Sequence, residues 1–346
     1  MSTGATSPLR IGLLGTGFIG TRVGDQLHGH PGATVTAVTD VDGAALSSAG
    51  DTFGVPGERR YTDYRTMFAE APLDAVVVGT PHTLHYEQIV DALDADLHVL
   101  CDKPLTTDLG DALDVRDRVE ASDRTLMVGY QRHLNPAFVA ARERWAERDP
   151  RWLTAEVTQD WVDRFEGTWR LDPDLSGGGY LYDTGSHLLD ALLWTTGLTP
   201  TAVSARMSFV DDERRVDERA DLTIRFAEGA TASVSTFGAA PCTREHIHGW
   251  DDDGALYLSG REWEPRDLLE IDAESGEHRP FVDHSAVRDK GEAFVAAVRG
   301  ERPPPATVQD GVRVTAVTEA AYESAREDGA WVDVDADLAV GTRTGR

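Results

Sequence analysis

Apolar runs alternate with amphipathic stretches over the first 130 residues of the chain. The apolar runs predict strands over Leu9–Leu14, Thr34–Thr39, Arg59–Tyr61, Asp74–Gly79, Leu97–Cys101 and Thr125–Tyr130. The stretches between them predict helices over Phe18–Leu27, Asp42–Ala49, Tyr64–Glu70, Leu84–Ala95 and Asp108–Ala121. Helices that connect parallel strands cover both faces of their sheet. This alternation therefore predicts an α/β protein whose residues 1–130 form a doubly wound Rossmann domain.

The pattern changes after residue 130, where predicted strands follow one another and often alternate between polar and apolar positions. These strands are expected over Leu153–Gln159, Ala202–Phe209, Ala220–Phe226, Ala230–Phe237, Arg244–Trp250, Gly254–Ser259 and Leu268–Asp272. Helical patterns interrupt them at Tyr182–Thr195, Ala286–Arg299 and Val308–Arg326. Alternating polarity is typical of antiparallel sheets with one covered face. Residues 131–346 are therefore predicted to form an α+β domain around a mostly antiparallel sheet.

The composition indicates a globular protein. A chain of 346 residues, 40% of them apolar, is long enough for two domains with sizeable cores. Its apolar runs are shorter than a membrane span, and Met1–Arg10 lacks the charged and apolar regions of a signal peptide. Cys101 and Cys242 form no disulfide framework and show no metal-ligand spacing. We expect a cytoplasmic protein with neither a membrane partner nor a metal.

The net charge is strongly negative, because 60 Asp and Glu residues outnumber 33 Lys and Arg residues and give −27. The acidic residues are scattered through apparently folded segments, which is unlike a disordered acidic tail. Such a surface repels nucleic acid, so none is expected as a partner. It resembles the acidic, lysine-poor surfaces of proteins from high-salt cytoplasms, where screening reduces self-repulsion. A halophilic source is therefore expected.

A glycine motif follows the first predicted strand and opens the first predicted helix. Its residues are Gly15, Thr16, Gly17, Phe18, Ile19 and Gly20. In this context Gly15 permits a tight turn, Gly17 lets the backbone approach a pyrophosphate, and Gly20 packs the helix against the sheet. The helix N-terminus presents unpaired amides to the phosphates. The motif predicts a dinucleotide site, and the alternative is a glycine turn with a structural role only.

Asp40 ends the second predicted strand, 20 residues after Gly20. A carboxylate at this place accepts hydrogen bonds from the adenosine ribose hydroxyls and repels a 2′-phosphate. The sequence therefore favours NAD over NADP. NADP stays the alternative, since arginines of the next loop could approach, and Asp40 could also be an ordinary turn residue. The arginines concerned are Arg59, Arg60 and Arg65.

Lys103 is one of two lysines in a chain that carries 31 arginines, and it ends the fifth predicted strand. Lysine supplies a compact ammonium whose proton is given up readily on burial, which arginine does not. A lysine kept at a strand end is therefore a candidate for proton or oxyanion chemistry. The alternative is a solvated lysine in a strand-to-helix loop.

Asp183 and His187 follow the glycine run Gly177–Gly179 and lie four residues apart at the start of a predicted helix. Side chains at this spacing share one face of an α-helix. A carboxylate beside an imidazole orients the ring and raises its pKa, which prepares it to accept a proton near neutral pH. Alternatively, Asp183 caps the helix and His187 is a core residue.

Further pocket candidates lie near the ends of predicted elements. Ligands bind at the carboxyl edge of doubly wound sheets, where the loops after the strands gather. The candidates are Thr80, Pro81 and His82 for the cofactor, and Tyr130, Arg132, His133, Trp169 and Arg170 for the substrate. Each of them could equally be a loop or packing residue.

Taken together, the glycine motif, the run Cys101–Pro104 and the Asp183–His187 pair resemble the Gfo/Idh/MocA family of sugar and polyol oxidoreductases. The family's Glu-Lys-Pro signature is replaced by Asp102, Lys103 and Pro104. The resemblance implies that Lys103 and the Asp–His pair face the nicotinamide from opposite domains. It also implies a second domain with an open antiparallel sheet, whose exposed face commonly forms a dimer or tetramer interface.

The resemblance and the residues together predict an NAD-dependent dehydrogenase that oxidises a secondary hydroxyl of an aldose or cyclitol. His187 would accept the hydroxyl proton, Asp183 would orient it, and Lys103 would contact cofactor and substrate and stabilise the alkoxide. Three alternatives stay open. They are an NADP-dependent aldose 1-dehydrogenase, a non-catalytic NAD-binding sensor of the same family, and a glycosidase that holds NAD tightly.

Overall fold

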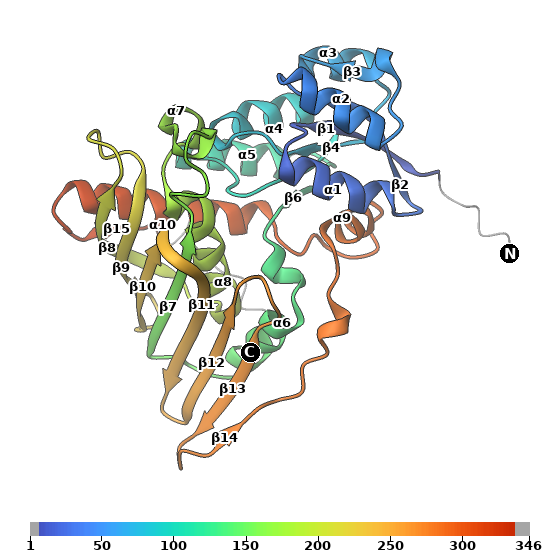
Figure 1. The fold of residues 1–346 in the computed structure, drawn as a ribbon. Coiled ribbons are helices and arrows are strands. Elements are labelled where there is room, and N and C mark those ends of the chain that lie inside the picture. Colours follow the sequence, from blue (N-terminus) through green and yellow to red (C-terminus); the bar gives the residue numbers. More distant parts are fainter. Residues whose placement is uncertain (1–6, 336–346) are drawn as a thin grey trace, which may run out of the picture. The chain divides into compact units, whose positions relative to one another are not determined.

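The computed structural model describes residues 7–335, which divide into two compact units (Figure 1). The first unit comprises the residues up to Leu105 together with Gly110–Gln131 and Arg288–Val308. The second unit comprises Thr106–Leu109, Arg132–Val287 and the residues from Gln309 onward. The sequence predicted domains over residues 1–130 and 131–346. In the structure Arg288–Val308 belong to the first unit.

The first unit has the predicted doubly wound architecture. Among the described residues, six parallel strands have the order β3-β2-β1-β4-β5-β6, which is the Rossmann order. The strands are β1 (Leu9–Leu14), β2 (Ala33–Thr39), β3 (Arg60–Tyr61), β4 (Ala75–Val78), β5 (His98–Cys101) and β6 (Leu126–Val128). The helices between them are α1 (Phe18–His28), α2 (Gly43–Thr52), α3 (Tyr64–Glu70), α4 (His85–Asp94) and α5 (Leu109–Glu120). Every residue of β4 is buried, as a central parallel strand requires.

A helix from far along the chain completes the first unit. This helix, α9 (Lys290–Val298), lies beside α1 in Figure 1 and contacts it. The sequence pattern predicted a helix from Ala286, but α9 begins four residues later. The side chain of Asp289 accepts a hydrogen bond from the Glu292 amide and so defines the helix start.

The second unit is built around the predicted, mostly antiparallel sheet. Within the described part of the chain this sheet has nine strands in the order β14-β13-β12-β11-β7-β10-β9-β8-β15, and only β7 and β10 pair in parallel. The strands are β7 (Trp152–Asp160), β8 (Pro200–Phe209), β9 (Asp217–Phe226), β10 (Thr231–Phe237), β11 (Ala239–Asp251), β12 (Gly254–Arg261), β13 (Asp267–Asp272), β14 (Glu277–His278) and β15 (Val332–Asp333). The helices are α6 (Pro136–Trp145), α7 (Pro173–Ser176), α8 (Ser186–Thr196) and α10 (Val308–Arg326).

Residues of the large sheet alternate between an inner and an outer face. On β11 the inner positions Ile247 and Gly249 are buried, whereas His246 and His248 point to the outer face. Gly249 is packed against Trp145 of α6, where a Cβ would lie 3.1 Å from the indole nitrogen. Alternation with period two is the physical basis of the pattern in the sequence. The helices α6 and α8 therefore lie on the inner face.

The helices of the second unit differ from the sequence-based assignment in two segments. The predicted helix Tyr182–Thr195 is in fact a π-helical turn, Leu181–Gly185, followed by α8. Helix α6 was not predicted, although Asn135 caps it and Pro136 is its first residue. Short 3-10 segments occur at Gly57–Arg59, His82–Leu84, Gln131–Leu134, Trp169–Leu171 and His284–Ala286.

Candidate functional site

The glycine motif forms the turn between β1 and α1. Gly15 has a φ of +80°, and a Cβ there would lie 2.8 Å from the Gly79 carbonyl oxygen. A Cβ on Gly20 would lie 1.9 Å from the Gly15 carbonyl oxygen, so only glycine lets the helix start this close to the turn. A Cβ on Gly17 would meet nothing within 4 Å. Gly15 and Gly20 are thus required for the geometry of the turn, whereas the space around Gly17 is open.

The N-terminus of α1 has the features of an anion site. Its cap residue, Gly17, provides no side-chain acceptor, and the first turn contains no acidic residue. The first amides of a helix carry partial positive charge and need acceptors. Phe18 is 72% exposed and Ile19 is half-buried, so bulky side chains do not bury this end. These residues fit the pyrophosphate of a dinucleotide.

Asp40 holds the glycine turn to the end of β2. Its Oδ2 accepts hydrogen bonds from the Thr16 amide at 2.6 Å and from the Thr16 hydroxyl at 2.9 Å. Its Oδ1 accepts a third bond from the Asp42 amide at 2.9 Å. The predicted carboxylate at the strand end is therefore present, and it has a second role, which sequence reasoning missed. It fixes the glycine turn, which is the candidate site for the phosphates.

The loop after β4 is connected to the loop after β5 by His85. The Nδ1 atom of His85 lies 2.8 Å from the Pro104 carbonyl oxygen, and Nε2 lies 3.1 Å from the Thr80 carbonyl oxygen. Burial lowers the pKa of His85, so the ring is neutral and donates one hydrogen bond. Of the predicted loop residues, Thr80 donates to Gln88 at 2.6 Å and His82 is buried beside His85. Pro81 precedes the short 3-10 turn.

Lys103 is buried directly after β5, with only 6% of the residue exposed. The preceding residue, Asp102, is nearly buried and forms an ion pair with Lys290 of α9, with an Nζ–Oδ1 distance of 3.2 Å. Burial opposes ionisation of Asp102, yet the cations Lys290 and Lys103 hold the pKa of this carboxyl below its usual value. The end of β5 therefore carries two ammonium groups around one carboxylate.

In the second unit, Asp183 is buried within the π-helical turn and is held by two donors. Its Oδ2 accepts hydrogen bonds from Trp161 Nε1 at 2.7 Å and from Arg170 Nε at 3.0 Å. The Arg170 guanidinium lies over the rings of Phe165 and Trp169, at 4.3 Å and 4.6 Å from their centroids. Arg170 and Trp169, predicted near the pocket, thus belong to the surroundings of Asp183. Sequence reasoning missed Trp161, whose tryptophan type alone indicated no role.

His187 lies in the first turn of α8, where it is buried. The π-helical turn before it is fixed by Asp217 at the start of β9, which accepts hydrogen bonds from the Leu181 amide at 3.0 Å and from the Tyr322 hydroxyl. Burial raises the pKa of Asp217 to about 6. π-Helical turns are rare and occur frequently at functional sites. Asp183 therefore stands in a different backbone geometry from the α-helix that the sequence predicted.

Two further predicted residues, Arg132 and His133, have charged partners within the second unit. Arg132 is buried, and its Nε donates to Glu245 at 2.7 Å, while Arg266 binds the other oxygen of that carboxylate at 2.8 Å. His133 contacts both oxygens of Asp190, at 2.9 Å and 3.0 Å. Glu245 and Asp190 are therefore partners of Arg132 and His133 in this structure, and a substrate role of either residue stays a prediction. Tyr130 is a buried residue of the first unit.

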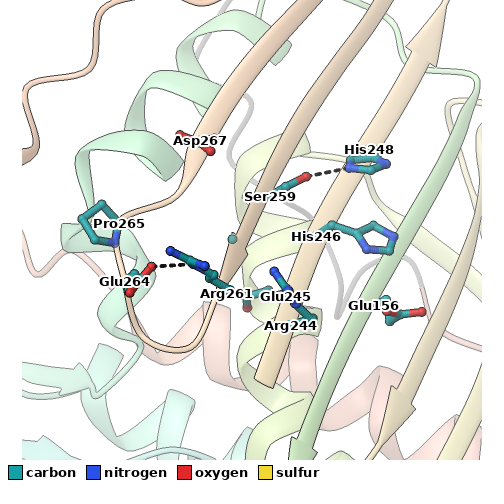
Figure 2. A pocket seen from close by; sticks show the side chains of 11 residues that line it. Glu156, Arg244, Glu245, His246, His248, Ser259, Arg261, Glu264, Pro265 and Asp267 are labelled. Carbon is teal, nitrogen blue, oxygen red and sulfur yellow. Dashed lines mark hydrogen bonds and ion pairs between the residues drawn. The ribbon is translucent and has the colours of Figure 1, made fainter. Parts of the chain in front are cut away.

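The outer face of the large sheet carries a separate hollow of about 610 Å³ (Figure 2). Ser259 lies 2.8 Å from Nε2 of His248, and burial lowers the pKa of His248 to about 4. By contrast, the inner face of β7 meets the π-helical turn, where Thr184 donates to Gln159 at 3.1 Å. The hollow and the turn that carries Asp183 therefore lie on opposite faces of the sheet, and we assign the hollow no part in the reaction.

No helix within residues 7–335 is long and apolar enough to cross a membrane. No group of three or more His, Cys, Asp or Glu side chains in the same range is arranged to hold a metal ion.

Comparison with protein families identifies the chain. Residues 9–130 match the oxidoreductase family with an NAD-binding Rossmann fold, Gfo/Idh/MocA. Residues 149–256 and 279–334 match two C-terminal domain models of the same family. The chain belongs to the Gfo/Idh/MocA family of oxidoreductases. The resemblance seen in the sequence motifs is thereby confirmed, as are the two-part α/β fold and the nicotinamide cofactor class.

Named relatives share nearly the whole chain. D-xylose 1-dehydrogenase (NADP(+)) 2 of Haloferax volcanii is 31% identical over 94% of this chain and 100% of its own length. Inositol 2-dehydrogenase 2 of Paenarthrobacter aurescens is 26% identical over 93% of this chain and 97% of its own. The structure of an inositol dehydrogenase homologue from Azotobacter vinelandii, in complex with NAD+, has a TM-score of 0.79 at 23% identity. It covers 96% of this chain and 99% of its own, and it shows a shared fold.

The glycine geometry predicts different effects for two alanine substitutions. Gly20→Ala should lower the free energy of unfolding by about 1–3 kcal/mol, because the new Cβ overlaps the Gly15 carbonyl. Gly17→Ala should cost less than about 1 kcal/mol, since space is open there, but it should weaken cofactor binding at the helix start. Chemical denaturation and titration with reduced cofactor would test both. Equal stability of the two variants would contradict this account of the turn.

The contacts of Asp40 predict a combined effect on cofactor choice and stability. Asp40→Ala should weaken NAD binding and improve the relative use of NADP, because a carboxylate that repels a 2′-phosphate is lost. It should also cost about 1 kcal/mol or more in unfolding free energy, since Thr16 loses its acceptor. Asp42→Ala is the control, because Asp42 caps α2 through Ala44 and does not contact Thr16. A wild-type protein that already prefers NADP would contradict the role of Asp40.

Proposed function

We propose that this oxidoreductase oxidises a secondary hydroxyl of a sugar or polyol, with the first unit binding the cofactor and the second unit binding the substrate. The observation that carries the proposal is chemical. One unit carries the glycine turn after β1 and buries a lysine at the end of β5, and the other holds a buried carboxylate four residues before a buried histidine. Alcohol oxidation needs a hydride acceptor, a proton acceptor and an oxyanion donor.

In this proposal each residue has a defined task. The bound nicotinamide supplies the hydride acceptor. His187 takes the proton of the substrate hydroxyl, and Asp183, itself fixed by Trp161 and Arg170, orients the histidine. Lys103 donates a hydrogen bond to the substrate oxygen, whose negative charge grows as the proton leaves. We propose that Lys103 contributes from the first unit and that Asp183 and His187 contribute from the second.

The named relatives support an aldose or a cyclitol as substrate, since they act on xylose and inositol according to their names. Both substrate classes present a ring hydroxyl flanked by further hydroxyls. A screen of pentoses, hexoses and inositols with NAD and NADP, followed by the absorbance of reduced cofactor at high and low salt, tests the proposal. Absence of cofactor reduction with every sugar and inositol in the screen would contradict the proposed function.

The cofactor proposal favours NAD, with NADP as the alternative. The carboxylate of Asp40 at the end of β2 supports NAD, because an acidic residue after the second strand of such a domain favours ribose hydroxyls over a 2′-phosphate. The name of the Haloferax relative supports NADP for that protein. The comparison of both cofactors in the substrate screen decides between them.

We propose that the protein is a cytoplasmic homodimer or homotetramer from a high-salt organism. The net charge of −27 supports high salt. Trp152 and Trp250 are neighbours across β7 and β11 on the outer face of the sheet and are 50% and 36% exposed. An exposed aromatic pair on an open sheet supports self-association through this face. Sedimentation of the wild type and of a Trp152→Glu variant tests this point.

Lys103→Met should lower turnover by at least about 10²–10³-fold, because an oxyanion donor is lost. Cofactor affinity should stay nearly intact, since the glycine turn and Asp40 hold the dinucleotide. Steady-state kinetics and fluorescence titration with reduced cofactor would measure the two quantities separately. Near-normal turnover in a folded variant would remove Lys103 from the mechanism.

The rate of oxidation should rise with pH through one ionisation, because a base accepts a proton only in its neutral form. His187→Ala should flatten this limb of the profile. Asp183→Asn should lower turnover, because the ring loses its orienting carboxylate. Rates measured across pH, with folding checked by circular dichroism, test these outcomes. A folded His187→Ala protein with an unchanged limb would assign the base role to another group.

A further inference from the structure

Both lysines of the chain lie at one carboxylate. Lys103 directly follows Asp102, and Lys290 pairs with the same Asp102 through an Nζ–Oδ1 distance of 3.2 Å. Of the 33 lysine and arginine residues in the chain, the other 31 are arginines. Each side chain of the pair is nearly buried, with 11% of Lys290 and 12% of Asp102 exposed. The chain therefore uses its two lysines where a compact ammonium is required.

Lys290 occupies a position that is unfavourable for a cation. It is the first residue of α9, at the end of the helix where the peptide dipoles place partial positive charge. Only 9% of the whole residue is exposed, so its ammonium loses most of its hydration. A buried ammonium at a helix N-terminus needs a compensating anion, and Asp102 is that anion. The ion pair therefore has a specific reason to exist in this place.

The space around the pair fits an ammonium closely. A Cβ on Gly129, just after β6, would lie 2.9 Å from Oδ1 of Asp102 and 3.1 Å from Nζ of Lys290. The Asp102 amide donates to the Val78 carbonyl of β4 at 2.8 Å. The ion pair thus lies where the ends of β4, β5 and β6 meet, and it ties α9 to that edge of the sheet.

We propose that Lys290 is a positioning residue for Lys103 and that it acts through its ion pair with Asp102. This inference rests on the proposed function of Lys103. Lys290 neutralises the carboxylate of Asp102, so this carboxylate attracts the neighbouring Lys103 less strongly. Without Lys290, the buried carboxylate has Lys103 as its nearest cation and draws it away from the site.

The other side of Lys103 is also fixed. The Pro104 carbonyl oxygen lies 2.8 Å from Nδ1 of the buried His85. The lysine is therefore held between two anchored neighbours, one by an ion pair and one by a backbone hydrogen bond. Asp102 is one methylene shorter than the glutamate of the family signature, and a long partner such as Lys290 reaches it.

The test compares substitutions at two ends of α9. Lys290→Met keeps much of the side-chain volume and removes the charge, whereas Lys290→Arg keeps the charge. Arg299→Met is the matched control, because Arg299 ends the same helix and contacts the Gly32 carbonyl at 3.3 Å. All three are measured as full-length protein with NAD, NADP and the best substrate of the screen.

Lys290→Met should lower kcat by about 10²-fold while the KM for the cofactor changes by less than about threefold, because a misplaced catalytic group slows the chemical step. Lys290→Arg should recover part of kcat, and Arg299→Met should keep it. Asp102→Asn in the Lys290→Met background should recover part of kcat as well, since no carboxylate is left to attract Lys103. Wild-type kcat in folded Lys290→Met would overturn the inference.

A spectroscopic measurement separates positioning from general stability. Protein labelled with ¹³C-lysine has two side-chain Cε resonances, and the one absent from Lys103→Met belongs to Lys103. This resonance should move in Lys290→Met and stay in place in Arg299→Met. An unmoved Lys103 resonance in Lys290→Met would leave only a structural role and would overturn the inference.

The two hypotheses fail in different ways. Near-normal kcat in Lys103→Met removes the proposed role of Lys103, and the positioning role of Lys290 with it. Loss of kcat in Lys103→Met together with normal kcat in Lys290→Met contradicts only the role of Lys290.

Discussion

A carboxylate buried at the end of β5 is the constraint around which the cofactor-binding unit is arranged. Asp102 has lost most of its hydration, so its charge must be balanced within the protein. The balancing ammonium of Lys290 comes from nearly 190 residues further along the chain. This ion pair joins the segment Arg288–Val308 to the Rossmann unit, together with the packing of α9 against α1. The positioning role that we propose for Lys290 rests on the same ion pair.

Buried carboxylates in the second unit follow the same physical rule with different partners. Glu245 is held by Arg132 and Arg266, which keep the pKa of its carboxyl low although burial opposes ionisation. Asp183 receives an indole and a guanidinium donor. Asp217 has mainly neutral donors, and burial raises its pKa to about 6. A chain with a net charge of −27 can therefore bury acids, provided that each one meets donors of the right kind.

Local pattern predicted most elements because burial on a sheet or helix face has a fixed period. The strand Leu9–Leu14 and the helices Tyr64–Glu70 and Val308–Arg326 were predicted with the bounds that the structure has. The π-helical turn Leu181–Gly185 was not, since its backbone is held by Asp217 and Tyr322 from distant segments. The start of α9 was predicted too early because periodicity does not show which residue caps a helix.

The sequence by itself determined the Rossmann unit, the dinucleotide turn, the family and the candidates Lys103, Asp183 and His187, because each depends on short-range spacing. Only the tertiary structure decided which side chains fix the glycine turn and the candidate residues in place. Asp40 fixes Thr16, Trp161 and Arg170 fix Asp183, and Lys290 reaches Asp102. Arg132, a pocket candidate by its position after a strand, pairs with Glu245, which lies 113 residues further along the chain. The physical reason is that partners of buried charges are selected by proximity in space, which no spacing along the chain encodes.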